Sequence, residues 1–182
     1  KLKSQIVGLM NSAENFVHSF ELSDGRKLCY YDSKTASQDV ILFFHGFPGG
    51  YRQGLLTLTS PLAQKFRFIS MDRPGLGASD LNPKGNLLSF AKDVEELLRN
   101  LKISQVRLLG VSGGAPYAMA CASHLKDSVQ RVSLICPLGP LGNPEVFSLM
   151  PEASQSLFRF YRKSRFLGNI VLRLFRRHFL KS

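Results

Sequence analysis

Strand-type and helix-type segments alternate along the chain between residues 40 and 136. Residues 40–44, Val-Ile-Leu-Phe-Phe, form a continuous apolar run, which is typical of a strand buried on both faces of a sheet. Further strands are expected at residues 66–71, 106–111 and 129–136, and helices at residues 55–65, 86–101 and 113–125. This alternation predicts an α/β fold, in which a mostly parallel sheet carries helices on both faces.

The segment before this alternation has a different pattern. Residues 16–23 and 26–31 each have the alternation of a strand, and Ser23-Asp24-Gly25 between them is a turn signal. We therefore expect a β-hairpin ahead of the parallel strands.

Residues 137–144, Pro-Leu-Gly-Pro-Leu-Gly-Asn-Pro, interrupt the alternation. Proline and glycine at this density are typical of a boundary between elements. The residues that follow are apolar and basic, with helical spacing over residues 156–182. Two parts are therefore expected: an α/β core at residues 1–142 and a helical segment at residues 143–182.

The chain is basic, with 24 Lys and Arg residues against 13 Asp and Glu and a net charge of +11. Residues 144–182 hold eight basic residues and two acidic ones, a net +6. Nucleic acid or an anionic membrane surface attracts such a tail, but a solvated helix face is the preferred interpretation. No nucleic-acid-binding motif is present, and no uncharged apolar run reaches the length of a transmembrane helix.

The cysteines indicate a reducing compartment. Cys29, Cys121 and Cys136 lie far apart in apolar stretches and lack the spacing of metal ligands. An odd, scattered set of this kind predicts reduced thiols in the core of a cytoplasmic protein.

Residues 110–114, Gly-Val-Ser-Gly-Gly, match the pattern G-x-S-x-G. The match is informative because it closes an apolar strand and opens a helix, which is the setting of a nucleophile elbow. Gly110 and Gly114 supply positions without side chains where strand and helix nearly touch. Ser112 is therefore the candidate nucleophile, held at a helix N-terminus that favours developing negative charge.

A second motif, His-Gly-Phe-Pro-Gly-Gly at residues 45–50, follows the apolar strand at residues 40–44. Acyl transfer passes through an oxyanion that two backbone N–H groups can stabilise. We expect these donors to be Gly113 and Phe47, since Pro48 has no N–H. His45 and Gly46 complete the oxyanion loop, where His45 is expected to hold the loop by hydrogen bonds rather than to act as a base.

A third motif at residues 72–80, Asp-Arg-Pro-Gly-Leu-Gly-Ala-Ser-Asp, follows the strand at residues 66–71. Its glycines match neither the dinucleotide-binding fingerprint nor the phosphate-binding P-loop. A structural turn, with Asp72 and Arg73 holding the loop, is the preferred interpretation.

Together, these three motifs at these separations resemble the α/β-hydrolase fold family, in its esterase-like single-domain group, over about residues 16–142. The resemblance implies Ser112 as nucleophile, Phe47 and Gly113 as oxyanion donors, and no metal or organic cofactor. It also implies that the segment after Cys136 leads into a helical lid over the active site.

The family places its catalytic acid and histidine after the nucleophile, and the sequence offers poor candidates for both. His124 lies on a helix that leads away from Ser112, and His18 and His178 belong to the first strand and the basic tail. Glu145 is the only carboxylate just past the last strand. A sheet that stops at that strand would also leave an open apolar edge. We therefore expect the sequence to be the N-terminal part of a longer hydrolase, inactive by itself.

Two functions follow from these observations. The first is a serine hydrolase acting on a small-molecule ester or similar acyl substrate. That substrate would be hydrophobic if Phe47, Leu157, Phe158 and Phe160 line the pocket. A serine nucleophile argues against epoxide or haloalkane chemistry, because the relatives that carry out this chemistry have an aspartate nucleophile at this position. The second is a non-catalytic binding protein on the same fold, whose basic amphipathic tail contacts a partner or an anionic membrane.

Overall fold

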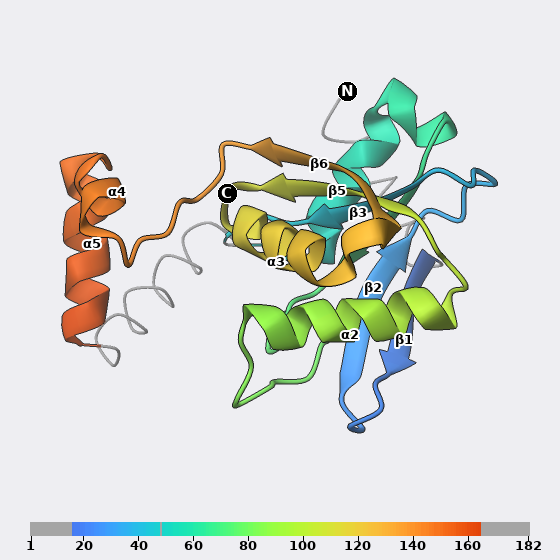
Figure 1. Cartoon of the computed structure of the whole chain (residues 1–182), viewed down its shortest axis with the longest axis horizontal. Coiled ribbons are helices and arrows are strands. Elements are labelled where there is room, and N and C mark those ends of the chain that lie inside the picture. Colours follow the sequence, from blue (N-terminus) through green and yellow to red (C-terminus); the bar gives the residue numbers. More distant parts are fainter. Residues whose placement is uncertain (1–15, 48, 165–182) are drawn as a thin grey trace, which may run out of the picture. The chain divides into compact units, whose positions relative to one another are not determined.

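The computed structural model describes residues 16–47 and 49–164 and divides the chain into two compact units, residues 1–138 and 139–182. The first unit contains one sheet of six strands in the order β1-β2-β4-β3-β5-β6 (Figure 1). Its strands are β1 (Val17–Glu21), β2 (Lys27–Asp32), β3 (Val40–Phe44), β4 (Arg67–Met71), β5 (Val106–Val111) and β6 (Val129–Ile135). The strands β4, β3, β5 and β6 run parallel, whereas β2 is antiparallel to both β1 and β4. The predicted α/β class and the mostly parallel sheet are therefore confirmed.

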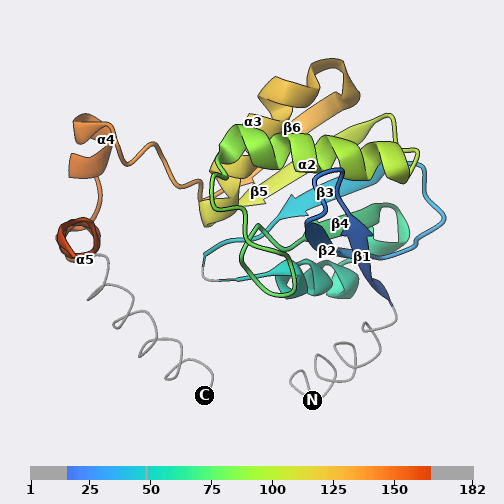
Figure 2. The same cartoon turned by 90° about the horizontal axis from the view of Figure 1, so that it is seen from below.

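Helical segments cover both faces of this sheet (Figure 2). The helices α2 (Leu87–Asn100) and α3 (Ala115–Leu125) pack side by side on one face. The 3₁₀ segments η2 (Tyr51–Thr59) and η3 (Pro61–Gln64) lie on the other face, in contact with β4. The larger cluster of buried apolar side chains joins the sheet to α2 and α3; β3 is buried along its whole length, and α2 contributes an apolar stripe. That stripe consists of Phe90, Val94, Leu97 and Leu98.

The predicted helix at residues 55–65 is wrong in type. The chain there forms two 3₁₀ segments separated at Ser60 rather than one α-helix. Proline disfavours the helical conformation in the residue before it, and Ser60 is extended, with φ −87° and ψ 145°. Its hydroxyl then accepts a hydrogen bond from the Leu62 N–H and starts the second segment.

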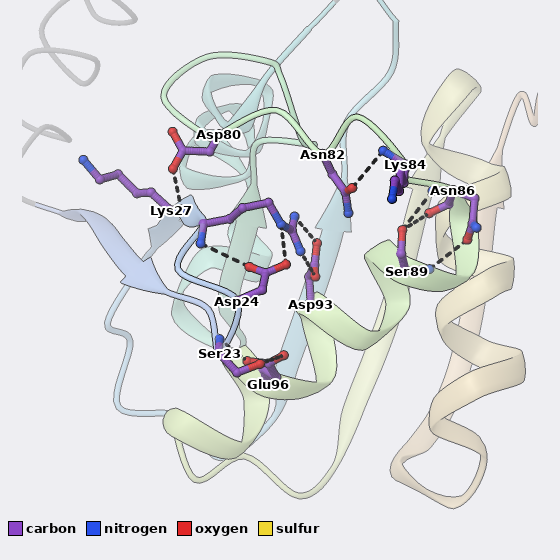
Figure 3. A network of polar contacts seen from close by, with 11 residues as sticks. Ser23, Asp24, Lys27, Asp80, Asn82, Lys84, Asn86, Ser89, Asp93 and Glu96 are labelled. Atoms are coloured by element: carbon purple, nitrogen blue, oxygen red, sulfur yellow. Dashed lines mark hydrogen bonds and ion pairs between the residues drawn. The ribbon is translucent and has the colours of Figure 1, made fainter.

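Polar contacts attach the β1–β2 hairpin to α2 (Figure 3). The turn reverses at Gly25, whose φ of +82° suits glycine. Arg26 then donates two hydrogen bonds, at 3.0 and 2.6 Å, to the carboxylate of Asp93, a buried residue of α2. The backbone and the hydroxyl of Ser23 both donate to Glu96 at 2.9 Å. These contacts fix the antiparallel hairpin beside the helix that covers the core.

Among the strands that the structure describes, β6 is last in the order and pairs only with β5. Three of its apolar residues, Val132, Leu134 and Ile135, are 37–50% exposed. Cys136 follows at the end of this strand and is exposed, so the prediction of a core thiol is wrong for it. Cys29 and Cys121 are buried, as expected, and burial raises the pKa of their thiols to about 11 and about 12.

The second unit contains the helices α4 (Pro144–Ser148) and α5 (Glu152–Lys163). Asn143 caps α4 by accepting hydrogen bonds from the N–H groups of Glu145 and Val146. The two units divide between Leu138 and Gly139, within the predicted boundary segment. Five of the eight basic residues of the tail lie within residues 165–182, outside the described residues. The role of this unit as a lid stays a prediction. None of the described helices combines the length and apolar character that a membrane span requires.

Candidate active site

The candidate nucleophile stands where β5 ends and the helical layer begins. Ser112 follows Val111, the last residue of β5, and opens a single 3₁₀ turn at residues 112–114 that leads into α3. Its φ is +50°, a conformation that costs energy for any residue with a side chain. A strained serine between a central strand and a helix has the backbone geometry of a nucleophile elbow.

The glycines around Ser112 are required by close backbone contacts. A Cβ atom on Gly114 would overlap the carbonyl group of Phe44, at the end of β3. A Cβ atom on Gly110 would lie 2.9 Å from atoms of both Ala115 and Ala118 on α3. These contacts let α3 start directly against the sheet, which makes the bend at Ser112 sharp.

The predicted oxyanion loop lies beside the elbow. A Cβ atom built on Gly46 would be 3.5 Å from the Cβ of Ser112. A Cβ atom built on Gly113 would be 3.4 Å from the backbone nitrogen of Phe47. The two backbone amides predicted as donors, those of Phe47 and Gly113, therefore belong to segments that meet next to Ser112. Their role as an oxyanion hole stays a prediction.

Arg73 connects these segments, and sequence analysis did not identify its targets. Its Nη1 donates to the carbonyl oxygens of His45 and Gly113, and its Nη2 donates to the carbonyl oxygen of Gly46, all at 3.1 Å. The guanidinium carbon lies 4.9 Å from the ring centre of Tyr117 on α3. One buried cation thus contacts the oxyanion loop and the elbow at the same time.

His45 is buried and supports the loop from within. Its Nδ1 lies 2.8 Å from the carbonyl oxygen of Gly46. Because a carbonyl oxygen only accepts, Nδ1 carries the proton in this contact. Burial, together with the nearby charge of Arg73, lowers the pKa of His45 to about 4. The imidazole is therefore neutral at physiological pH, and its hydrogen bond lies within the loop. That His45 holds an oxyanion loop stays a prediction.

The turn at residues 72–80 fixes the same region. Each carboxylate oxygen of Asp72 accepts one backbone N–H, from Tyr51 at 2.7 Å and from Ala78 at 3.1 Å. The hydroxyl of Ser79 donates to the Asp72 carbonyl oxygen and accepts the N–H of Cys29. Burial raises the pKa of Asp72 despite these donors. This carboxylate is engaged by backbone groups and holds the loop that carries Arg73.

The structure assigns the described histidines to places other than Ser112. His18 lies against the ring of Tyr30 in the hairpin, at a centroid distance of 5.4 Å. The Nε2 of His124 lies 2.8 Å from a carboxylate oxygen of Glu95, between α3 and α2. His178 lies outside the described residues. Within residues 16–47 and 49–164, no hydrogen bond joins a histidine side chain to Ser112.

Two further groups at the site were not found from the sequence. The amide oxygen of Gln53, in η2, accepts the Gly46 N–H at 2.8 Å. The Leu138 N–H donates to the carbonyl oxygen of Ser112 at 3.1 Å. Neither contact leaves a signal in the sequence, because both depend on how distant segments meet. Of the residues expected to line an apolar pocket, Phe47 is 58% exposed, and the side chain of Leu157 lies outside the description.

Comparison with known proteins identifies the family. The model of the alpha/beta hydrolase fold family matches residues 39–180. The chain belongs to the α/β-hydrolase fold family. This match includes all three motifs at the site, so the predicted resemblance is confirmed.

Individual relatives carry different names. The chain is 23% identical to epoxide hydrolase 2 of Caenorhabditis elegans over 165 residues, covering 88% of the chain and 46% of that protein. It is 26% identical to a putative esterase/lipase of Haemophilus influenzae over 119 residues, covering 63% of the chain and 41% of that protein. The solved structure of Cfl2 from Burkholderia cenocepacia superposes with a TM-score of 0.73 at 23% identity, covering 90% of the chain and 56% of Cfl2. The chain spans less than half the length of both curated relatives.

Proposed function

We propose that this chain carries the nucleophile half of a serine hydrolase that cleaves an ester or a similar acyl bond. The observation that carries the proposal is Ser112, strained at φ +50° between β5 and α3, with the Phe47 and Gly113 amides close by. A serine at this position argues against the carboxylate nucleophile of epoxide hydrolysis. The name of the esterase/lipase relative supports an acyl substrate.

The chemistry would proceed in two steps. The Ser112 hydroxyl oxygen bonds to the substrate's carbonyl carbon while a general base takes the hydroxyl proton. The oxyanion that forms accepts hydrogen bonds from the Phe47 and Gly113 N–H groups. The alcohol then leaves with that proton, and water cleaves the acyl-enzyme in the same way. The described residues provide the nucleophile and the amide donors, while the base is still required.

We further propose that the base and its acid partner come from polypeptide outside the described residues. The exposed outer edge of β6 supports this, because a further parallel strand can pair there and carry such residues to the Ser112 end of the sheet. The buried free thiols of Cys29 and Cys121 support the expected cytoplasmic location.

A fluorophosphonate probe tests the nucleophile directly. The 182-residue chain and the product of its complete reading frame are each treated with the probe, and the labelled peptide is identified by mass spectrometry. We expect the complete product to react at Ser112 and the Ser112→Ala variant to lose all labelling. The 182-residue chain should react at least ~100-fold more slowly, because loss of the base costs orders of magnitude in rate.

The matched control is Ser123→Ala, which removes an exposed serine from α3 and should label like the wild type. A complete product that stays unlabelled at Ser112 would contradict the hydrolase proposal. It would favour the second candidate, a non-catalytic binding protein, which the exposed cations Arg159, Arg162 and Lys163 at the end of α5 also support. Salt-sensitive sedimentation with anionic vesicles would then be the next measurement.

A further inference from the structure

The oxyanion donor on the loop is one half of a peptide unit whose other half is held by two side chains. The N–H of Phe47 and the carbonyl group of Gly46 belong to the same planar peptide bond. In a trans peptide these two groups point in opposite directions. Whatever fixes the direction of the Gly46 oxygen therefore also fixes the direction of the Phe47 N–H.

Two donors occupy the Gly46 oxygen. The Nδ1–H of His45 approaches at 2.8 Å and the Nη2 of Arg73 at 3.1 Å, and both side chains are buried. A carbonyl oxygen has two lone pairs, so these two donors use both of the hydrogen bonds that the Gly46 oxygen can accept. A rotation of the peptide would bring the Gly46 oxygen toward Ser112 and leave both buried donors without their partner.

The donor on the elbow is oriented in the same manner but by different groups. The N–H of Gly113 shares its peptide with the carbonyl group of Ser112. That oxygen accepts the N–H of Leu138 at 3.1 Å and the N–H of Ala115. Arg73 instead contacts the carbonyl oxygen of Gly113, which belongs to the next peptide.

We propose that Arg73 and His45 are positioning residues that orient the Gly46–Phe47 peptide, so that the Phe47 N–H points to the oxyanion formed at Ser112. The inference rests on the proposed hydrolase function. Arg73 contributes more than His45 because its guanidinium also donates to two further carbonyl oxygens. The oxygen of His45 belongs to the oxyanion loop and that of Gly113 to the elbow, so Arg73 joins the two segments. The two N–H donors are thereby kept at a fixed separation before any substrate binds.

The sequence allows the two peptides to be observed separately. Gly46–Phe47 is the only Gly-Phe pair in the chain, and Ser112–Gly113 is the only Ser-Gly pair. Carbonyl-¹³C glycine with ¹⁵N phenylalanine gives one cross-peak for the first peptide in a triple-resonance NMR spectrum. Carbonyl-¹³C serine with ¹⁵N glycine gives one for the second, which serves as the internal control.

The variant is Arg73→Met. The spectra are recorded on the 182-residue chain, in which each pair occurs once, and the kinetics are measured on the complete reading-frame product. We expect the Gly46–Phe47 cross-peak to move or broaden while the Ser112–Gly113 cross-peak stays in place. With an ester substrate, kcat should fall at least ~10-fold and at most by the ~100- to 1,000-fold known for complete loss of one oxyanion donor, and KM should change less than about threefold. Arg73→Lys keeps the charge but lacks the planar guanidinium with its several N–H donors, so it should restore kcat only in part.

Arg107→Met is the matched control. Like Arg73, Arg107 lies over an aromatic ring, here that of Phe66, and it also forms an ion pair with Asp39. It should leave both cross-peaks and kcat unchanged. If Arg73→Met does not fold, judged by near-ultraviolet circular dichroism, Arg73→Lys carries the test through the same two readouts.

Two outcomes overturn the inference in distinguishable ways. In the first, the wild type reacts at Ser112, but the Gly46–Phe47 cross-peak of the Arg73 variant stays in place, or moves while kcat is unchanged. This result overturns the inference alone. A wild type that does not react at Ser112 overturns the hydrolase proposal and the inference with it.

Discussion

At the scale of single residues, the site depends on buried side chains. Each of these is either neutral or hydrogen-bonded to other groups. His45 shows this best, because the residue is 1% exposed and lies close to the cation of Arg73. Its Nε2 has no hydrogen-bond partner among the described residues. Protonation would therefore place a second positive charge in the same buried region without an acceptor to stabilise it.

This arrangement predicts a pH dependence of stability. The pKa of His45 is lowered from 6.5 to about 4 on folding, so below pH 6.5 the unfolded chain takes up the proton first. The stability contributed by the neutral ring is present above pH 6.5 and is lost as the pH falls toward 4, by about 2–3 kcal/mol at pH 4.5. His45→Asn keeps a donor near the Nδ1 position but does not titrate. Urea unfolding at pH 7.5 and 4.5 should therefore show a smaller pH difference for the variant. Equal differences in both proteins would contradict the prediction.

At the scale of elements, local signals fixed most helix and strand limits. Helix α2 begins where the side chain of Asn86 accepts the Ser89 N–H at 2.9 Å and the Ser89 hydroxyl accepts the Asn86 N–H at 2.8 Å. This reciprocal pair satisfies two of the N–H groups that a helix start leaves open. The predicted helix at residues 86–101 comprises this helix and its two cap residues, Asn86 and Leu101.

Removing the cap should destabilise α2 and the core that it covers. Asn86→Ala should lower the free energy of unfolding by about 1 kcal/mol, the usual cost of a lost N-cap. Asn82→Ala, in the preceding turn, is the comparison, since the Asn82 side chain accepts the N–H of the exposed Lys84 at 3.2 Å and caps no helix. Chemical denaturation of both variants measures the difference. An Asn86 variant as stable as the Asn82 variant would show that the cap contributes nothing to the fold.

At the scale of the whole molecule, the sheet has an unusual outer strand. Within residues 16–47 and 49–164, β6 exposes apolar side chains on both of its faces and pairs with another strand on one side only. Native sheets protect such edges with charge, proline or further structure, because an open apolar edge pairs with other chains.

The 182-residue chain should therefore self-associate through β6. Ile135→Lys places a charge on a side chain that is 50% exposed in this strand and should shift the chain toward the monomer in analytical ultracentrifugation. Met119→Lys adds the same charge at an equally exposed position of α3 and should leave association unchanged. A wild-type chain that is monomeric across the concentration range would disprove the prediction.

Sequence patterns were enough to predict the α/β class, most of the element limits and the placement of Ser112 at a strand-to-helix bend. These features follow from local periodicity and from glycines that only tight turns require, so short windows of sequence contain them. The exposure of Cys136 and the targets of Arg73 depend instead on tertiary contacts, whereas the break at Ser60 has a local cause, Pro61, which the helix prediction did not take into account. Arg73 is 28 residues from His45 and 40 from Gly113 in the chain, and no local pattern records which distant carbonyl a buried guanidinium will meet. That meeting is set by the packing of β3, β4 and β5, which brings three loops to one end of the sheet.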